Sequence, residues 1–313
     1  MEKRSLILVT GASGMAGSAV MRELREQGYT NIRGIDKTQC DLTDSIAVNV
    51  LFEALRPEYV FHIAAKVGGI NANNTQSADF TYENLMMECN VIHAAKVFAV
   101  KKLIFCGSAC IYPKDTPMPI KEEYFLSGKL EETNKGYAVA KIAGVILCEM
   151  YRKQYGCDFI SAMPTNLYGE NDNFHLTDSH VLPALLRKFH DAKINNLPSV
   201  SVWGSGIARR EFLYIGDLAK ALIFLMNHYS SPEPINIGTG DDICINSLVD
   251  LIRKTVGYAG EVKWDTSYPD GVTVRNMDVT KLTLMGWNAE TPLPKGIENA
   301  YKWFVDNFNT ARK

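Results

Sequence analysis

Leu6-Ile-Leu-Val-Thr-Gly-Ala-Ser-Gly-Met-Ala-Gly17 lies near the start of the chain and decides its fold class. The apolar run Leu6–Thr10 is short and uninterrupted, as is typical of a buried parallel strand. Gly11, Gly14 and Gly17 follow where this strand turns into a predicted helix. Glycines there permit a tight turn and close backbone approach, and the helix N-terminus favours a pyrophosphate. The stretch predicts a dinucleotide-binding unit, with an ordinary strand–helix turn as the alternative.

Strands and helices alternate through the first half of the chain. Further strands are predicted over Asn31–Ile35, Tyr59–Ile63, Lys102–Cys106 and Phe159–Met163. The intervening helices are predicted over Gly14–Gln27, Ser45–Leu55, Asp79–Phe98 and Tyr137–Tyr155. Such alternation favours an α/β fold with a Rossmann-type, doubly wound parallel sheet.

After Pro164 the alternation breaks down. Helices are predicted over His180–Lys193, Asp217–Asn227, Ser247–Val256 and Lys295–Asn307, and the apolar run Ile235–Gly238 could return to the sheet. We therefore expect a cofactor domain over residues 1–165, with a returning strand and helix near 211–240. A smaller, partly interleaved α/β substrate domain is expected over 166–313, with the ligand cleft between the two.

Composition excludes several classes of function. The net charge is −2 and the pI is about 6.3, so no basic surface is expected to recruit nucleic acid or acidic lipid. None of the seven cysteines lies in a CxxC pair, which indicates a reducing compartment and neither a disulfide framework nor a metal site. No stretch approaches the roughly 18 apolar residues of a membrane span. We expect a soluble, cytoplasmic protein.

Tyr137-Ala-Val-Ala-Lys141 contains the only one of fourteen tyrosines that is followed by a lysine four residues later. On a helix this spacing places both side chains on one face. An ammonium beside a phenol lowers the tyrosine pKa, so the pair could exchange a proton with a ketone oxygen. Taken alone, the spacing is more often a surface pair.

Ser108 and Cys110 follow the fourth predicted strand. If the backbone stays extended, both side chains point into one cleft. Ser108 could then donate a hydrogen bond to a carbonyl, and Cys110 could act as a base. A small buried hydrophobe is the commoner role of an unpaired cysteine, and that is the interpretation for the remaining cysteines, Cys40, Cys89, Cys106, Cys148, Cys157 and Cys244.

His180 opens a predicted helix and is a candidate proton carrier, with a capping or surface histidine equally favoured. His175 lies nearby, without further ligands for a metal. The remaining histidines are interpreted as structural. Side chains suited to stacking on a base and clamping a diphosphate follow, with a surface patch as the alternative; they are Lys188, Trp203, Arg209 and Arg210.

The end of the second predicted strand should select the coenzyme. An acidic residue there accepts from the ribose 2′-hydroxyl, whereas a cation suits a 2′-phosphate. This chain has both, as Asp36-Lys37. Asp41-Leu42 could reach the adenine, and a solvated loop is the alternative for all of these residues.

Longer segments resemble the extended short-chain dehydrogenase/reductase family, and within it most closely the GDP-L-fucose synthases. The match runs nearly end to end, and its most specific parts are the VGGI, SxCIYP and SHVLP motifs. The segments are Ala65-Lys-Val-Gly-Gly-Ile70, Asn73-Asn74, Gly107-Ser-Ala-Cys-Ile-Tyr-Pro113, Tyr137-Ala-Val-Ala-Lys-Ile-Ala-Gly144, Pro164-Thr-Asn-Leu-Tyr-Gly169, Asn171-Asp-Asn-Phe174, Ser179-His-Val-Leu-Pro183, Arg210-Glu-Phe212 and Tyr268-Pro-Asp-Gly271.

The resemblance implies a reaction on GDP-4-keto-6-deoxy-D-mannose. The C4 ketone acidifies the hydrogens at C3 and C5, and Cys110 as base and His180 as acid would invert both centres. NADPH would then reduce C4 while Tyr137 protonates the oxygen. Lys141 would hold the nicotinamide ribose and lower the Tyr137 pKa, and Ser108 would polarise the ketone.

The resemblance also implies binding positions. Substrate contacts would come from Lys188, Trp203, Arg210 and Asp270. Contacts to NADP(H) would come from Gly11, Ser13, Gly14, Met15, Gly17, Asp36, Lys37, Asp41, Leu42, Ala64, Ala65, Cys106, Gly107, Ser108, Lys141, Pro164, Thr165, Asn166, Leu167 and His180. A homodimer would pair the helices that begin near Asp79 and Tyr137.

Three sites depart from the family pattern, one of them Gly136, which precedes Tyr137 where proline is frequent. Ala109 stands where many relatives have a second serine, and Asp36-Lys37 where bacterial relatives often have arginine. Three alternative functions remain open. They are a reductase or epimerase-reductase of a related GDP-4-keto sugar such as a heptose, a UDP-sugar 4-epimerase, and a dinucleotide-sensing regulator on the same fold. A dehydratase would carry Asp-Glu after the serine, where this chain has Ala109-Cys110.

Overall fold

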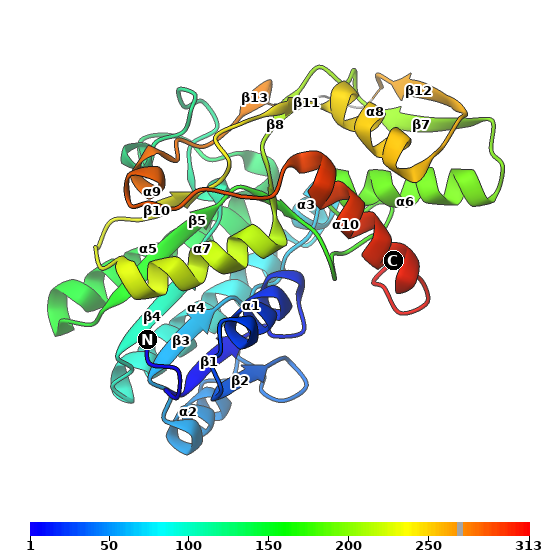
Figure 1. Ribbon diagram of the computed structural model, residues 1–313. Helices are drawn as coiled ribbons and strands as arrows, with labels where there is room; N and C mark the ends of the chain where they lie inside the picture. Colours follow the sequence, from blue (N-terminus) through cyan, green and yellow to red (C-terminus); the bar gives the residue numbers. More distant parts are fainter. Residues whose placement is uncertain (268–271) are drawn as a thin grey trace.

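A computed structural model describes residues 1–267 and 272–313. Its centre is a parallel sheet of six strands in the order β2-β1-β3-β4-β5-β10, which confirms the predicted fold class (Figure 1). The strands are β1 (Ile7–Thr10), β2 (Ile32–Ile35), β3 (Tyr59–His62), β4 (Lys102–Cys106), β5 (Phe159–Pro164) and β10 (Ile235–Ile237). The apolar run in the second half of the chain thus forms the edge strand next to β5.

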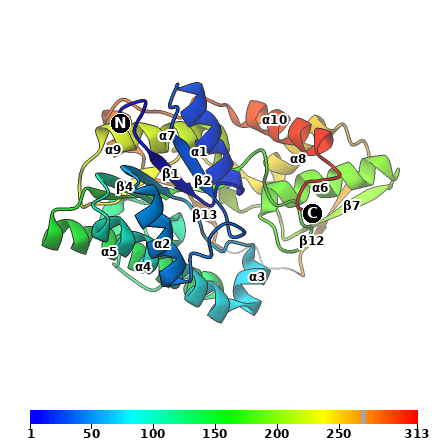
Figure 2. The same cartoon turned by 90° about the horizontal axis from the view of Figure 1, so that it is seen from below.

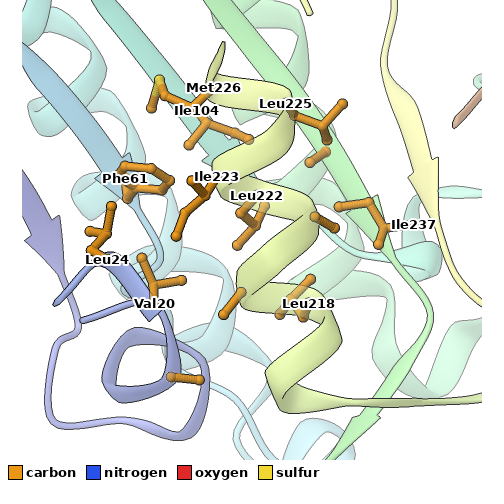
Figure 3. Close-up of a cluster of buried hydrophobic side chains, with 14 of the residues drawn as sticks. Val20, Leu24, Phe61, Ile104, Leu218, Leu222, Ile223, Leu225, Met226 and Ile237 are labelled. Atoms are coloured by element: carbon orange, nitrogen blue, oxygen red, sulfur yellow. The ribbon is translucent and has the colours of Figure 1, made fainter. Parts of the chain in front are cut away.

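Helices cover both faces of the sheet. One face packs against α1 (Met15–Glu26) and α7 (Ile215–His228), whose side chains interdigitate with those of the strands (Figure 3). The other face packs against α2 (Ser45–Leu55), α4 (Ser77–Val97) and α5 (Lys135–Tyr155), the last two lying against each other (Figure 2). Asp44 caps α2 by accepting from the Ile46 amide at 2.8 Å, as a residue of its type at an N-cap should.

The order of the strands places the ligand crevice. From β1 the chain adds β2 on one side and then β3, β4 and β5 on the other, so the winding reverses at β1. In open parallel sheets a crevice opens beyond the carboxyl ends of the strands at this reversal. The glycine turn after β1 and the segments after β3, β4 and β5 all lie at that edge.

A second body of structure lies over this edge (Figure 1). Its core packs three helices, α6 (Val181–Ile194), α8 (Ile245–Val256) and α10 (Leu293–Asp306), with a parallel pair of strands, β7 (Ser199–Trp203) and β12 (Glu261–Asp265). Each of these helices lies within two residues of its predicted bounds.

Short elements connect the two bodies, and the sequence patterns did not predict them. Strand β6 (Asn166–Tyr168) pairs with β9 (Phe212–Tyr214), and β8 (Arg209–Arg210) lies between β11 (Ile243–Cys244) and β13 (Val274–Arg275). The remaining short helices are α3 (Ile70–Thr75), α9 (Thr280–Leu284) and the 3-10 turns η1 (Ala109–Ile111), η2 (Glu122–Tyr124) and η3 (Glu132–Asn134).

Candidate active site

Ser108 and Cys110 lie directly beyond β4. The condition that the backbone stays extended holds for Ser108 but not for Cys110, which lies in the 3-10 turn η1. The Ser108 hydroxyl oxygen accepts from the Cys110 amide at 3.2 Å and caps the 3-10 turn η1, a local bond that competes with an extended strand. The Asn134 side-chain amide donates to the Cys110 sulfur at 3.2 Å.

Tyr137 and Lys141 share the first turns of α5. The Lys141 ammonium lies 5.8 Å from the centre of the Tyr137 ring, so the predicted common face is present. Burial, followed by the nearby Cys110, raises the pKa of Tyr137 well above its usual value, and a hydrogen bond with Ser108 opposes this shift. The expected fall of the Tyr137 pKa towards working pH is therefore absent, because desolvation of the phenol raises this pKa.

Lys141 is held by a partner that the sequence analysis missed. Its ammonium lies 3.0 Å from the Glu88 carboxylate of α4 and donates to the Cys106 carbonyl at 3.0 Å. Glu88 lies on the buried stripe of α4 with Phe80, Asn84 and Val91. This one acidic residue at helical spacing within a buried face was the signal that could have identified it.

His180 is the N-cap residue of α6 and makes no capping bond through its side chain. It is accessible to solvent, and the surrounding protein lowers its pKa by desolvation. The preceding loop is fastened to the segment before α3: the Gly69 amide donates to the Asp178 carbonyl at 2.8 Å. A Cβ at Gly69 would lie 2.6 Å from the Ser179 carbonyl, so this contact requires glycine.

The glycine turn fits a nucleotide pyrophosphate. Gly11 has φ +70°, and a Cβ at Gly17 would lie 2.1 Å from the Gly11 carbonyl oxygen. The turn is fixed from the second body, because the Asn171 side chain donates to the Ser13 carbonyl at 2.8 Å. Met15 is the first residue of α1, so the turn leads directly into a helix N-terminus. The sequence motif Asn171–Phe174 contains this residue but gave no sign of its contact with Ser13.

The coenzyme-selecting loop follows β2. The Asp36 carboxylate accepts from the Thr38 amide and hydroxyl at 2.9 and 2.6 Å, and these bonds lower its pKa. Lys37 is 76% exposed and lies 3.9 Å from Glu83. Asp41 accepts from the Thr43 amide and hydroxyl in the same way, while Leu42 is buried. Of these side chains, Lys37 is the least constrained.

The other predicted cofactor contacts lie at the same edge of the sheet. Ala64 and Ala65 follow β3, Cys106 and Gly107 end β4, and Pro164–Leu167 run from β5 into β6. Burial raises the pKa of Cys106 to about 11, so this thiol stays protonated. The carboxyl ends of adjacent parallel strands therefore bring these segments together.

The predicted substrate residues lie in the second body. The Lys188 ammonium lies 4.6 Å above the ring of Trp203, which is 44% exposed. Arg210 donates to the Val272 carbonyl at 2.6 Å and lines a hollow of about 290 Å³ that contains none of the catalytic candidates among its described lining residues. Arg209 pairs with Asp242. Asp270 lies outside the described residues.

The six cysteines other than Cys110 are interpreted above as small buried hydrophobes, and this interpretation is wrong for three of them. Cys40, Cys106 and Cys148 are buried, but Cys89 is exposed and Cys157 and Cys244 are half-buried. Cys89 is on the outer side of α4, since the buried face of that helix is occupied by its neighbour Glu88. Periodicity along a helix of low amphipathicity did not distinguish the two faces.

No helix within residues 1–267 and 272–313 is long and apolar enough to cross a membrane. The same residues contain no cluster of three or more histidine, cysteine, aspartate or glutamate side chains arranged to hold a metal ion.

Residues 7–238 match the NAD dependent epimerase/dehydratase family. The chain belongs to this family. It is 48% identical to the GDP-L-fucose synthase of Escherichia coli K12, over 96% of this chain and 97% of that relative. The family resemblance and the enzyme class predicted from the motifs are confirmed.

Two solved structures are also similar. A GDP-L-fucose synthetase from Naegleria fowleri bound to NADP has a TM-score of 0.92 and 34% identity, covering 100% of this chain and 96% of that one. A GDP-mannoheptose C4 reductase from Campylobacter jejuni with NADP bound has a TM-score of 0.89 and 39% identity, covering 97% and 99%.

Proposed function

We propose that this chain is a GDP-L-fucose synthase, which inverts C3 and C5 of GDP-4-keto-6-deoxy-D-mannose and then reduces C4 to give GDP-L-fucose. The observation that carries the proposal is that Cys110 lies close enough to Tyr137 to raise the pKa of its phenol, with Asn134 donating to the Cys110 sulfur. A simple ketone reductase or a UDP-sugar 4-epimerase has no use for a thiol there. The name and high identity of the Escherichia coli relative support the same reaction.

Epimerisation requires a base and an acid at carbons next to the ketone. Cys110 is the candidate base for the C3 and C5 protons, and the Asn134 side-chain amide donates a hydrogen bond to its sulfur at 3.2 Å, which fixes the direction of the thiol. His180 is the candidate acid that would return protons, and it follows a loop that the hydrogen bond between Gly69 and Asp178 holds in place. Ser108 would donate to the C4 oxygen, where the enolate charge develops.

Reduction uses a second set of side chains. When bound, NADPH supplies the hydride that reduces C4. Tyr137 has a raised pKa, so its phenol remains protonated and can donate to the C4 oxygen. Lys141 lies on the same face of α5 and would hold the nicotinamide ribose and stabilise the phenolate once Tyr137 has given up its proton.

NADPH is the coenzyme that the second strand favours. Asp36 already accepts two hydrogen bonds from Thr38, whereas Lys37 is exposed and available to a 2′-phosphate. The glycine turn would hold the pyrophosphate, since it leaves no room for side chains at Gly11 and Gly17. Residues 1–165, with the segment near 211–240, would form the cofactor domain, and 166–313 the substrate domain.

We also propose a homodimer formed through α4 and α5. These helices carry exposed apolar side chains, which is a feature of association surfaces; they are Tyr82, Val97, Val139, Met150 and Tyr155. All seven cysteines are free, which supports a cytoplasmic location. Light scattering of the purified chain tests the dimer, and Met150→Glu should shift it towards the monomer.

The reaction is tested by incubating the chain with GDP-4-keto-6-deoxy-D-mannose and either NADPH or NADH, and identifying the sugar by NMR. GDP-L-fucose as the product supports the proposal. A 4-reduced sugar without inversion would remove Cys110 and His180 from the mechanism. Binding of NADPH without turnover of this sugar, but with turnover of a GDP-4-keto-heptose, would favour the activity named for the Campylobacter jejuni structure.

A further inference from the structure

A buried ion pair lies behind the candidate reductive site. Glu88 of α4 and Lys141 of α5 are each 1% exposed, and the carboxylate oxygen lies 3.0 Å from the ammonium nitrogen. Lys141 also donates to the Cys106 carbonyl at 3.0 Å and lies 4.7 Å from the centre of the Phe105 ring. The ammonium is therefore enclosed by α4, α5 and the end of β4.

The Glu88 carboxylate makes no polar contact other than that with Lys141 among the described residues. Apart from Lys141, neither of its carboxylate oxygens has a hydrogen-bond partner in residues 1–267 or 272–313. Burial raises the pKa of Glu88, and Lys141 opposes this shift. Apolar residues of similar volume stabilise a fold as well as or better than a buried ion pair, so stability is a weak reason for its presence.

We propose that Glu88 is a positioning residue that holds the Lys141 side chain in place and keeps it charged, an inference that rests on the reductase function proposed above. An ammonium has three N–H donors. The Cys106 carbonyl accepts from one of them and the Glu88 carboxylate holds the ammonium as an ion pair at 3.0 Å, so a further N–H donor can serve the cofactor ribose or the Tyr137 oxygen. Without Glu88, the flexible four-carbon side chain of Lys141 would no longer hold its ammonium towards the cofactor and Tyr137.

The charge of Glu88 matters as much as its geometry. An ammonium that is cut off from water is stable only beside an anion; otherwise burial favours the neutral amine. Glu88→Gln keeps the shape and removes the anion, so in this variant Lys141 should lose its proton as the pH rises through the neutral range. The contact with the cofactor would then weaken at alkaline pH.

The surrounding titratable groups do not change protonation over this range. His62 has a pKa of about 3 because it is buried, and burial raises the pKa of Cys106 to about 11 and that of Cys148 to about 12. Burial also raises the pKa of Tyr137 and of Cys89, the neighbour of Glu88 on α4. A new pH dependence between pH 6 and pH 9 would therefore report on Lys141.

The test is a titration of NADPH into the parent and Glu88→Gln at pH 6, 7.5 and 9, followed by fluorescence. We expect equal affinities at pH 6 and binding about tenfold weaker than the parent at pH 9. Glu88→Asp should keep the parental pH profile. Glu58→Gln removes an ion-paired carboxylate beside Lys101 at the opposite edge of the sheet and should match the parent throughout.

A double-variant cycle separates positioning from general damage. In a Lys141→Met background, Glu88→Gln should have no effect on NADPH affinity, because its action passes through Lys141. The same loss in both backgrounds, or a parental pH profile in Glu88→Gln, would overturn the proposal. If Glu88→Gln does not fold, the Glu88→Gln/Lys141→Met pair should fold, and failure of that pair as well would assign Glu88 to stability. No sugar substrate is used, so these results do not depend on which GDP-sugar the enzyme takes.

Discussion

The two bodies of this molecule are built on different principles. In the first body, which contains the central sheet, the strands are three to six residues long, and all but β10 lie beside a strand that is close in the chain. Where the second body joins the first, two-residue strands such as β8, β11 and β13 connect segments that are far apart in the chain. The candidate chemistry lies where they meet, with Tyr137 and Cys110 supplied by the first body and His180 by the second. Variants in one body should therefore disturb one ligand and leave the other.

The largest effect should follow from closing the glycine turn. Gly17→Val introduces a Cβ that would lie 2.1 Å from the Gly11 carbonyl oxygen, far inside van der Waals contact. NADPH binding should weaken by about 100-fold or more, corresponding to roughly 3 kcal/mol. Gly28→Ala is the control for backbone strain beside α1: Gly28 has φ +81°, so alanine is strained there, but its Cβ meets nothing within 4 Å and NADPH affinity should be unchanged. Equal affinities of Gly17→Val and the parent would show that the turn does not approach the cofactor.

Coenzyme choice should depend on the loop after β2. Lys37→Ala should raise the KM for NADPH by about tenfold and leave the KM for NADH nearly unchanged, because one phosphate contact is lost. Steady-state kinetics with both coenzymes measures the ratio. Equal effects on the two coenzymes would point to Asp36 as the selecting residue instead. Lys101→Ala, at the other end of the sheet, should alter neither value.

A variant of the second body should weaken binding of the GDP-sugar and leave NADPH binding unchanged. Trp203→Ala removes the exposed ring below Lys188. The KM for the GDP-sugar should rise about tenfold through lost stacking, with the NADPH dissociation constant unchanged. Leu197→Ala, another exposed side chain of this body, serves as the control. A parallel loss of NADPH affinity in Trp203→Ala would contradict the separation of the two bodies.

The smallest effect concerns stability and pH. Burial raises the pKa of Asp172 to about 7, above the value of 3.8 for a free side chain, so the folded chain binds this proton more tightly than the unfolded chain. Its contribution to the free energy of unfolding is complete below pH 4 and is lost as the pH rises to about 7.

Asp172→Asn cannot ionise, so its melting temperature should fall less than the parent's between pH 5 and pH 8, by a few degrees. Thermal unfolding at both pH values measures this difference. Asp265→Asn should behave like the parent, because hydrogen bonds from Ser267 lower the pKa of Asp265, so this carboxylate stays ionised from pH 5 to pH 8. A parental fall in Asp172→Asn would show that Asp172 is not the group responsible.

The first body, which contains the central sheet, could be predicted from the sequence because most of its elements follow from patterns of neighbouring residues. Buried strands show as short apolar runs, Asp44 marks the start of α2, and the YxxxK spacing places Tyr137 and Lys141 on one face. The strand Ile235–Ile237 was visible too, although its place beside β5 depends on contacts that span more than seventy residues.

The rest depended on contacts that no local pattern records. The 3-10 turn after Ser108 forms because the hydroxyl accepts the Cys110 amide, and the Tyr137 pKa rises because packing removes water. Glu88 reaches Lys141 across 53 positions of the sequence, and strands of two residues carry no periodicity at all.

Deuterium exchange at the sugar tests most directly whether inversion and reduction use separate side chains. The substrate would be incubated in D₂O without coenzyme, with the parent, Cys110→Ser or Tyr137→Phe, and followed by NMR. The account predicts deuterium at C3 and C5 with the parent and with Tyr137→Phe, and no enzyme-dependent exchange with Cys110→Ser. Parental exchange at both carbons in Cys110→Ser would contradict it.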